Sequence, residues 1–213
     1  MTPNTTCKEL YVVTLRDYQA DLVSKIHQLQ DAGVRSICAV SPTGAGKTVI
    51  ASEIIRHARS NGKKVMFWAH RKELIDQCCN KLDWAGLRDY GVFKGRRHPR
   101  YNPGRPIQVA SVQTLIRRDH WKADLVIIDE CHRSTAKSYV KLIERYEERP
   151  QIIGLTATPY RDSGKPLGDI YEAIAEGPSV SYLVERGYLR NPVVYGAERV
   201  DVKGLKITAG DYN

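Results

Sequence analysis

The eight residues from Ser41 to Thr48, S-P-T-G-A-G-K-T, are the first stretch whose types and spacing point to chemistry. They match the phosphate-loop pattern G-x-x-x-x-G-K-[ST] in its last three residues, while Ser41 replaces the first glycine. In such loops backbone N–H groups hold phosphate oxygens, the lysine reaches the β- and γ-phosphates, and the threonine hydroxyl ligates Mg²⁺. The same residues also fit a glycine-rich turn that enters a helix. We predict that the following residues bind a nucleotide: Thr43, Gly44, Ala45, Gly46, Lys47 and Thr48.

A second candidate is L-V-I-I-D-E-C-H, residues 125–132, in which four apolar residues precede an acidic pair. A strand there would carry Asp129 and Glu130 to its carboxyl end, where phosphates would lie. Asp129 is suited to Mg²⁺ coordination, and Glu130 could position or deprotonate an attacking water. Alone, an acidic pair ending a strand is more often a solvated turn. Together with the phosphate loop it predicts a catalytic set of Lys47, Asp129 and Glu130, with Thr48 and Asp129 as the metal ligands.

The elements that must position these residues alternate between short apolar runs and segments with helical periodicity. The runs predict strands at 36–40, 64–69, 107–110, 125–129 and 152–156. The periodic segments predict helices at 17–32, 47–60, 72–84, 137–146 and 180–186. Such alternation indicates an α/β fold, with a mostly parallel sheet and helices on both faces. Four glycines stand just past helices and are expected to adopt left-handed caps: Gly33, Gly62, Gly86 and Gly187.

The bulk composition limits the partners and the compartment. The 213 residues carry a formal charge of +9, which favours a polyanionic partner such as nucleic acid or an anionic membrane. No apolar run approaches the roughly 18 residues of a membrane span, and the first residues lack a signal-peptide layout. The five cysteines are irregularly spaced and are expected to be reduced thiols. A cytoplasmic location follows as an expectation.

Six motifs in order make the sequence resemble the DEAD/H-box-type helicases and translocases of superfamily 2. They are L-R-D-Y-Q (15–19, like the Q motif), the phosphate loop, A-H-R-K-E-L (69–74, Ia), A-S-V-Q-T-L (110–115, Ib), D-E-C-H (129–132, II) and L-T-A-T-P (155–159, III). The resemblance implies a RecA-like P-loop NTPase lobe over residues 1–195, with 196–213 as a tail or connector. The segment G-P-S-V-S-Y-L-V-E-R-G-Y-L (177–189) is most similar to DNA-repair and transcription-factor helicases and restriction-enzyme motors.

The resemblance also implies roles for individual residues and makes ATP with Mg²⁺ the expected cofactor. Gln19 would read the adenine, with Arg16 as its neighbour. His132 would link the phosphate site to Thr156 and Thr158 of motif III, which couples that site to the strand-binding face. Residues expected to contact the nucleic-acid backbone are Arg71, Gln113 and Thr114, inherited by position in motifs Ia and Ib.

A basic run lies between motifs Ia and Ib. From residue 91 to 118 there are seven Lys or Arg residues and no Asp or Glu. The run reads either as a solvated loop or as a strip that binds phosphates, in which Arg96 and Arg97 would take part. Phosphate contacts position a strand without reading its bases, so we expect sequence-independent binding. DNA is favoured over RNA only through the subgroup resemblance.

Family members carry two RecA-like lobes, and the second supplies an arginine that stabilises charge on the transferred phosphoryl group. The sequence after L-T-A-T-P contains no second lobe, so we expect lobe one of a longer protein, with very weak activity alone. One alternative is a stand-alone nucleic-acid-binding module with a nucleotide-controlled switch. Another is a P-loop enzyme acting on small molecules, such as a kinase, which would leave motifs Ia, Ib and III unexplained.

Overall fold

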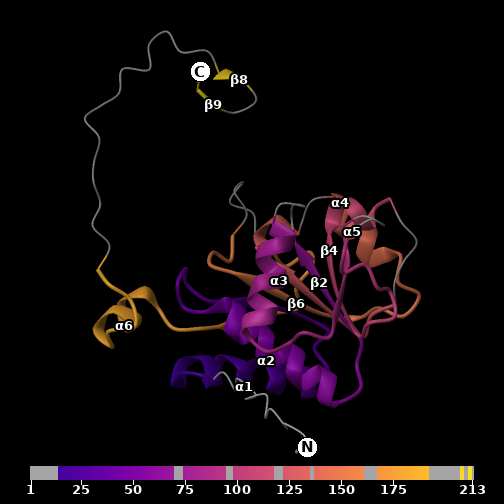
Figure 1. Ribbon diagram of the computed structural model, residues 1–213. Helices are drawn as coiled ribbons and strands as arrows, with labels where there is room; N and C mark the ends of the chain where they lie inside the picture. Colours follow the sequence, from indigo (N-terminus) through magenta and orange to yellow (C-terminus); the bar gives the residue numbers. More distant parts are fainter. Residues whose placement is uncertain are drawn as a thin grey trace, which may run out of the picture.

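The computed structural model describes residues 14–69, 74–94, 98–117, 122–134, 137–160 and 167–191, and the backbone of 207–208 and 211–212. Its centre is a seven-stranded sheet in the order β3-β4-β2-β5-β6-β1-β7, with every pair parallel (Figure 1). The strands are β1 Ser36–Val40, β2 Val65–Ala69, β3 Tyr90–Phe93, β4 Ile107–Ser111, β5 Leu125–Asp129, β6 Gln151–Thr156 and β7 Ala173–Glu176.

The helices are α1 Asp17–Asp31, α2 Lys47–Ser60, α3 Leu74–Trp84, α4 Val112–Leu115, α5 Lys137–Glu144 and α6 Val180–Glu185, with a 3-10 turn, η1, at Cys131–Arg133. Two further short strands, β8 Ile207–Thr208 and β9 Asp211–Tyr212, pair with each other antiparallel. They fall within the segment 196–213 that the sequence marks as a tail or connector.

Alternate residues of each strand feed two separate cores. In β1, Ile37 packs with the residues of α1, α2 and α3, whereas the next residue, Cys38, packs with those of α4 and α5. In β2, Phe67 and Trp68 divide between the same two cores. Successive strand side chains point to opposite faces, so helices on both faces are what an all-apolar strand requires. The predicted α/β class, with a parallel sheet covered by helices on both faces, is confirmed.

The sequence missed the two outermost strands. β3 contains Gly91, at which an added Cβ would lie 2.2 Å from the carbonyl oxygen of Asn102, so the close approach of the backbone requires glycine. β7 is an edge strand with Ile174 51% exposed, and it lacks the continuous apolar run of a buried strand. Elsewhere β1 and β5 have the predicted bounds, and the other predicted strands and helices shift by at most two residues.

The smaller structural expectations are largely met. All four cap glycines have positive φ, between +71° and +86°. The four cysteines that the structure describes are free and buried: Cys38, Cys78, Cys79 and Cys131. In the described part of the chain, no helix is long and apolar enough to cross a membrane.

Two imidazoles meet between α1 and α2. The ring centroids of His27 and His57 are 4.2 Å apart, and Nε2 of His27 is buried without a hydrogen-bond partner among the described residues. Burial, aided by the nearby His57, lowers the pKa of His27. The helix pair therefore favours a neutral ring at position 27.

This pair predicts a pH-dependent loss of stability. Because the folded-state pKa of His27 lies below the ordinary value of 6.5, the unfolded chain takes up this proton first as the pH falls. The stability contribution of neutral His27 is complete above pH 6.5 and declines as the pH falls through the folded-state pKa. Melting temperatures measured at pH 7.5 and 5.5 should show a smaller acid-induced drop for His27→Gln than for wild type. Equal drops would contradict the assignment.

Candidate functional site

The phosphate loop leaves the carboxyl end of β1 and turns into α2 through two left-handed glycines. The Ser41 amide donates to the Thr156 carbonyl at 2.9 Å, which fixes the loop's first residue to β6. Gly44 has φ +83° and Gly46 φ +86°, conformations that other residues rarely adopt. The amides of Gly44, Gly46, Lys47 and Thr48 have no hydrogen-bond partner among the described residues. Unpaired amides at a helix start form a cradle for anions.

Two side chains of this loop could also make further hydrogen bonds or ion pairs. The Lys47 ammonium donates to the Ser41 carbonyl at 3.3 Å and makes no ion pair within the described residues. The Ser41 hydroxyl is buried with no partner there. Thr43 and Gly44 are exposed at the tip, while Ala45 is buried. A loop with unpaired amides, an ammonium without an ion pair and an open tip fits a bound polyphosphate.

The acidic pair ends β5 as the sequence predicts. Asp129 is the last strand residue, and one of its carboxylate oxygens accepts a hydrogen bond from the Glu130 amide at 3.1 Å. Burial raises the pKa of Asp129. The side chain of Glu130 remains 43% exposed, and its φ of 50° is the one positive value among the described non-glycine residues. A left-handed backbone strains a residue with a Cβ, by about 1–2 kcal/mol.

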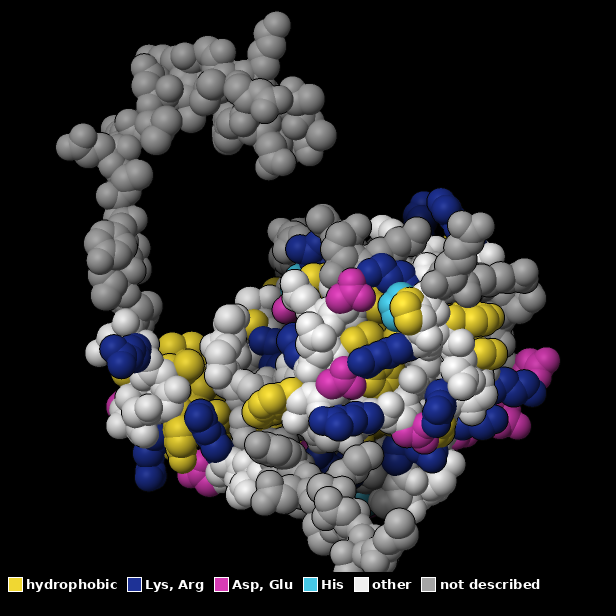
Figure 2. Space-filling model, in the orientation of Figure 1, with side chains coloured by type: hydrophobic (Ala, Val, Ile, Leu, Met, Phe, Trp, Pro, Cys, Tyr) yellow, Lys and Arg dark blue, Asp and Glu magenta, His cyan; other side chains and the backbone are white. Residues whose placement is uncertain are grey.

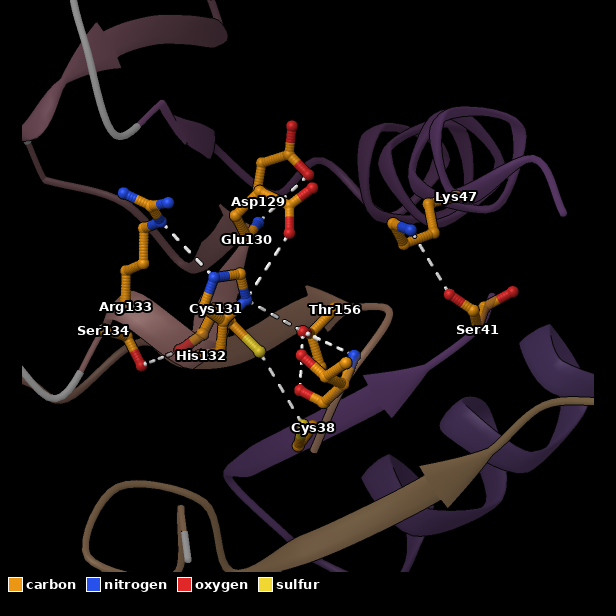
Figure 3. Close-up of polar contacts among 11 residues, drawn as sticks. Cys38, Ser41, Lys47, Asp129, Glu130, Cys131, His132, Arg133, Ser134 and Thr156 are labelled. Carbon is orange, nitrogen blue, oxygen red and sulfur yellow. Dashed lines mark hydrogen bonds and ion pairs between the residues drawn. The ribbon is translucent and has the colours of Figure 1, made fainter. Parts of the chain in front are cut away.

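His132 connects this acidic pair to β6 (Figure 3). Arg133 Nε donates to His132 Nε2 at 3.3 Å, which assigns the neutral ring's proton to Nδ1. That nitrogen then donates to Thr156 Oγ1 at 3.1 Å, with a Glu130 carboxylate oxygen 3.5 Å away. The Thr156 hydroxyl donates in turn to the Thr158 carbonyl at 2.8 Å. The structure thus brings the three residues of the predicted link into one chain; their coupling role stays a prediction.

A glycine in β6, Gly154, leaves space for the side chains of Cys131 and Tyr171, next to this chain of contacts. Cys131 Sγ lies 3.7 Å from Cys38 Sγ, across the strand between them. A Cβ at Gly154 would lie 2.6 Å from Cys131 Cβ and 2.5 Å from the Tyr171 hydroxyl. Tyr171 also donates to Ser134 at 3.1 Å. The turn that holds Glu130 and His132 is therefore held against the sheet by the contacts of Cys131 and Ser134.

The Q-motif residues lie against the phosphate loop. Gln19 is 4% exposed, and both ends of its amide are engaged. Its Oε1 accepts from the Arg16 amide and its Nε2 donates to the Ala45 carbonyl, both at 3.0 Å. The Tyr18 hydroxyl donates to the same carbonyl at 3.1 Å. Gln19 thus braces the loop, while the Arg16 side chain is exposed beside it.

The residues predicted for nucleic-acid contact are placed unevenly. Gln113 is exposed on α4, whereas Thr114 is 6% exposed and its hydroxyl lies 2.8 Å from that of Ser111, the N-cap of the helix. Ser111 also accepts from the Thr114 amide. Arg71, Arg96 and Arg97 lie outside the described residues.

Acidic side chains neutralise much of the basic run. Lys94 pairs with Asp76 at 2.6 Å and Arg100 with Asp83 at 2.8 Å, both partners on α3. Arg105 pairs with Asp89 at 2.5 Å. Figure 2 accordingly shows dark-blue and magenta side chains interspersed on the face over α3. Among the described members of the run, Arg117 makes no such pair.

Sequence reasoning missed Arg145, which follows α5. Its guanidinium donates to the carbonyls of Leu115 and Ile116 at 3.3 and 3.2 Å, and so holds the carboxyl end of α4. A lone arginine after a helix carries no signal of this contact. The Ser111 cap was detectable, because serine is among the residues preferred at the N-cap of a helix.

Comparison with known proteins places these features in a family. Residues 12–161 match the family model described as "Type III restriction enzyme, res subunit". A 51.5 kDa protein of Lactococcus phage (isolate 7-9) is 34% identical over 81% of this chain and 35% of its own length. The putative ATP-dependent helicase IRC3 of Saccharomyces cerevisiae is 30% identical over 93% of this chain and 31% of its own. The chain therefore spans about a third of the length of these two relatives.

Solved structures show the same fold. The UvsW helicase of bacteriophage T4 aligns with a TM-score of 0.64 at 21% identity, covering 76% of this chain and 59% of UvsW. The type ISP restriction-modification enzyme LlaGI, solved with a DNA substrate mimic, aligns with a TM-score of 0.62 at 16% identity, covering 82% and 21%.

The buried acidic residue predicts a conflict between stability and chemistry. Since burial raises the pKa of Asp129, the fold loses stability as the pH rises through that pKa. Asp129→Asn keeps an oxygen for the Glu130 amide and removes the charge, so at pH 8 it should stabilise the protein by about 1 kcal/mol. Thermal unfolding should show a melting temperature roughly 2–4 °C higher, and the gain should shrink as the pH is lowered.

Glu130→Gln is the matched control, because it removes the neighbouring and more exposed charge. It should raise the melting temperature less than Asp129→Asn. A destabilised Asp129→Asn variant at pH 8 would contradict the assignment of burial as the dominant cost.

Proposed function

The chain belongs to the family of the type III restriction enzyme res subunit and is a RecA-like lobe of the superfamily 2 helicase type, and we propose that it is the ATP-binding lobe of an ATP-dependent DNA helicase or translocase. The carrying observation is the convergence of the phosphate loop and the acidic pair at one edge of the sheet. Thr156 lies opposite Val40, the last residue of β1, and Leu155 lies opposite Asp129. The loop and the acidic pair therefore flank the end of a single strand.

In the proposed site the unpaired amides between Gly44 and Thr48 hold the phosphates, and Lys47 neutralises their charge. Thr48 and Asp129 would hold Mg²⁺, which when bound neutralises charge on the phosphate oxygens. Glu130, exposed at the strand end, orients and deprotonates the attacking water. Two protein ligands suffice here, because a nucleotide-bound Mg²⁺ takes its other ligands from phosphates and water.

The other predicted roles extend this site. Arg16 and Gln19 border the base, and Thr43 closes the loop tip. The chain of contacts from His132 through Thr156 to Thr158 reports the state of the γ-phosphate to the strand-binding face. These assignments rest on the contacts described above together with the family.

For nucleic acid we propose binding along the backbone, with DNA as the substrate. The relatives' names support a helicase, and LlaGI was solved with a DNA mimic. Gln113 on α4 is exposed to make such a contact, and Arg145 holds that helix. We propose that Arg71, Arg96 and Arg97 supply the charge, since Lys94, Arg100 and Arg105 are paired with aspartates.

We further propose that efficient turnover needs a second RecA-like lobe, which would supply an arginine to the phosphoryl group. Such an arginine is worth about 10³–10⁵ in rate. The second candidate function is a stand-alone nucleic-acid-binding module switched by nucleotide. The chain from Glu130 to Thr158 would serve that function too, and DNA affinity that ATP leaves unchanged would argue for it.

Steady-state ATP hydrolysis by the 213-residue chain tests the site. We expect ATP–Mg²⁺ binding with negligible turnover, with or without DNA, and loss of binding in Lys47→Ala. Lys141→Ala, an exposed lysine on α5, is the matched control and should bind as wild type does. DNA-stimulated turnover that Lys47→Ala abolishes would reveal a self-sufficient ATPase and refute the need for a second lobe.

Salt dependence tests the nucleic-acid contact. If about four phosphates of a single strand are neutralised, log K should fall with log salt at a slope near −3. Fluorescence anisotropy with two single strands of unrelated sequence should give the same slope and similar affinities. An affinity insensitive to salt would refute backbone-directed binding.

A further inference from the structure

The segment 177–189, here called the arm, leaves β7 beside the phosphate loop. The Gly177 amide donates to the Val40 carbonyl at 2.8 Å, one residue before the loop begins. An added Cβ at Gly177 would lie 2.7 Å from that carbonyl, so only glycine allows the approach. Ser179 then caps α6 by accepting from the Tyr182 amide at 3.1 Å. The start of the arm is thus fixed to the strand that leads into the nucleotide site.

The arm next packs on the loop and on α1. Leu183 is fully buried in a small cluster with Tyr18 and Ala45, against which Leu189 also packs. Leu189 Cδ2 lies 2.9 Å from where a Cβ on Gly44 would be. In Figure 2 the hydrophobic side chains of the α6 region gather on the part turned toward the rest of the domain.

The side chain of Tyr188 makes three specific contacts, to three consecutive residues of the Q motif. Its hydroxyl donates to an Asp17 carboxylate oxygen at 3.1 Å. Its ring meets the Tyr18 ring edge-on, with centroids 5.0 Å apart. The Arg16 guanidinium lies over the Tyr188 ring, 5.0 Å from its centroid. Arg16 also donates to the Tyr18 hydroxyl at 3.3 Å.

These contacts define how Arg16 can meet a base. The central carbon of its guanidinium lies over the Tyr188 ring, and the Arg16 residue as a whole is exposed. Gln19 is committed at both ends to the backbone, so it has little capacity left for reading a base. A flat cation held against an aromatic ring presents its other face for stacking on a purine.

We propose that Tyr188 is a positioning residue for base selectivity: it holds the Arg16 guanidinium flat so that a purine nucleotide stacks on it. The inference deepens the proposed function and rests on it. Tyr188 contacts Arg16 directly, and Gln19 braces the phosphate loop independently of Tyr188. Loss of Tyr188 should therefore weaken the binding of nucleotides and leave the binding of polyphosphate unchanged.

The test measures affinities of ATP and inorganic tripolyphosphate, each with Mg²⁺, by isothermal titration calorimetry on the full 213-residue chain. In Tyr188→Leu the affinity for ATP should fall roughly threefold to tenfold, a typical loss for a cation–aromatic contact, with tripolyphosphate unchanged. Tyr188→Phe keeps the ring, loses the hydroxyl bond to Asp17, and should retain most of the ATP preference. Tyr182→Leu makes the same change on the same arm, at a ring covered by Arg186, and should match wild type.

A double-mutant cycle separates positioning from general support. Arg16→Lys keeps the positive charge but removes the planar guanidinium group, and it should lower the affinity for ATP as Tyr188→Leu does. If Tyr188 acts through Arg16, the double variant should be no weaker than the weaker single variant. Additive losses, an unchanged Tyr188→Leu, or equal losses for ATP and tripolyphosphate would each overturn the proposal. Wild-type protein that binds tripolyphosphate without preferring ATP would overturn the inference alone, and protein that binds neither would refute the proposed function as well.

Discussion

Parallel strand pairing is the constraint on which the rest of this molecule depends. When every strand runs the same way, every segment that follows a strand begins at the same edge. The register of β1, β6 and β5 then sets Val40 beside Thr156 and Leu155 beside Asp129. A slip of one residue would move one side of the site by about 3.3 Å and exchange the faces of its strand. The two apolar cores, each fed by alternate residues, hold that register.

The parts of the fold predictable from sequence are those with strong local causes. The runs at Ser36–Val40 and Leu125–Asp129 are apolar except at one end residue each, because both faces of the sheet are covered, and their bounds were predicted. β3 and β7 were not predicted, because an outer strand has fewer neighbours and its sequence has a weaker apolar pattern. The residue types at the candidate site were readable from motifs. The bracing of the loop by Gln19 and the contact of Tyr188 with Arg16 join residues far apart in the chain, and no local pattern records them.

Charge shows the same difference between sequence and space. Between residues 91 and 118 the sequence is basic without an acid, and read alone it suggests a continuous positive strip. In the fold, aspartates of α3 and of the loop after it lie against the described part of this run and pair with Lys94, Arg100 and Arg105. Exposed ion pairs of this kind add little stability, but they reduce the positive electrostatic potential at the surface of the run. What the run offers a polyanion is therefore set by its unpaired members.

Glu130 has a consequence for how this lineage can vary. Its left-handed backbone is one that Gly or Asn adopts more readily than Glu. Two opposed effects thus act at position 130. The local backbone conformation favours replacement of glutamate, while the proposed chemistry requires its carboxylate. Random substitution at this position would therefore favour a more stable protein that lacks the proposed activity. Exchange of Glu130 for glycine or asparagine would therefore relieve backbone strain and at the same time remove the carboxylate that the proposed chemistry needs.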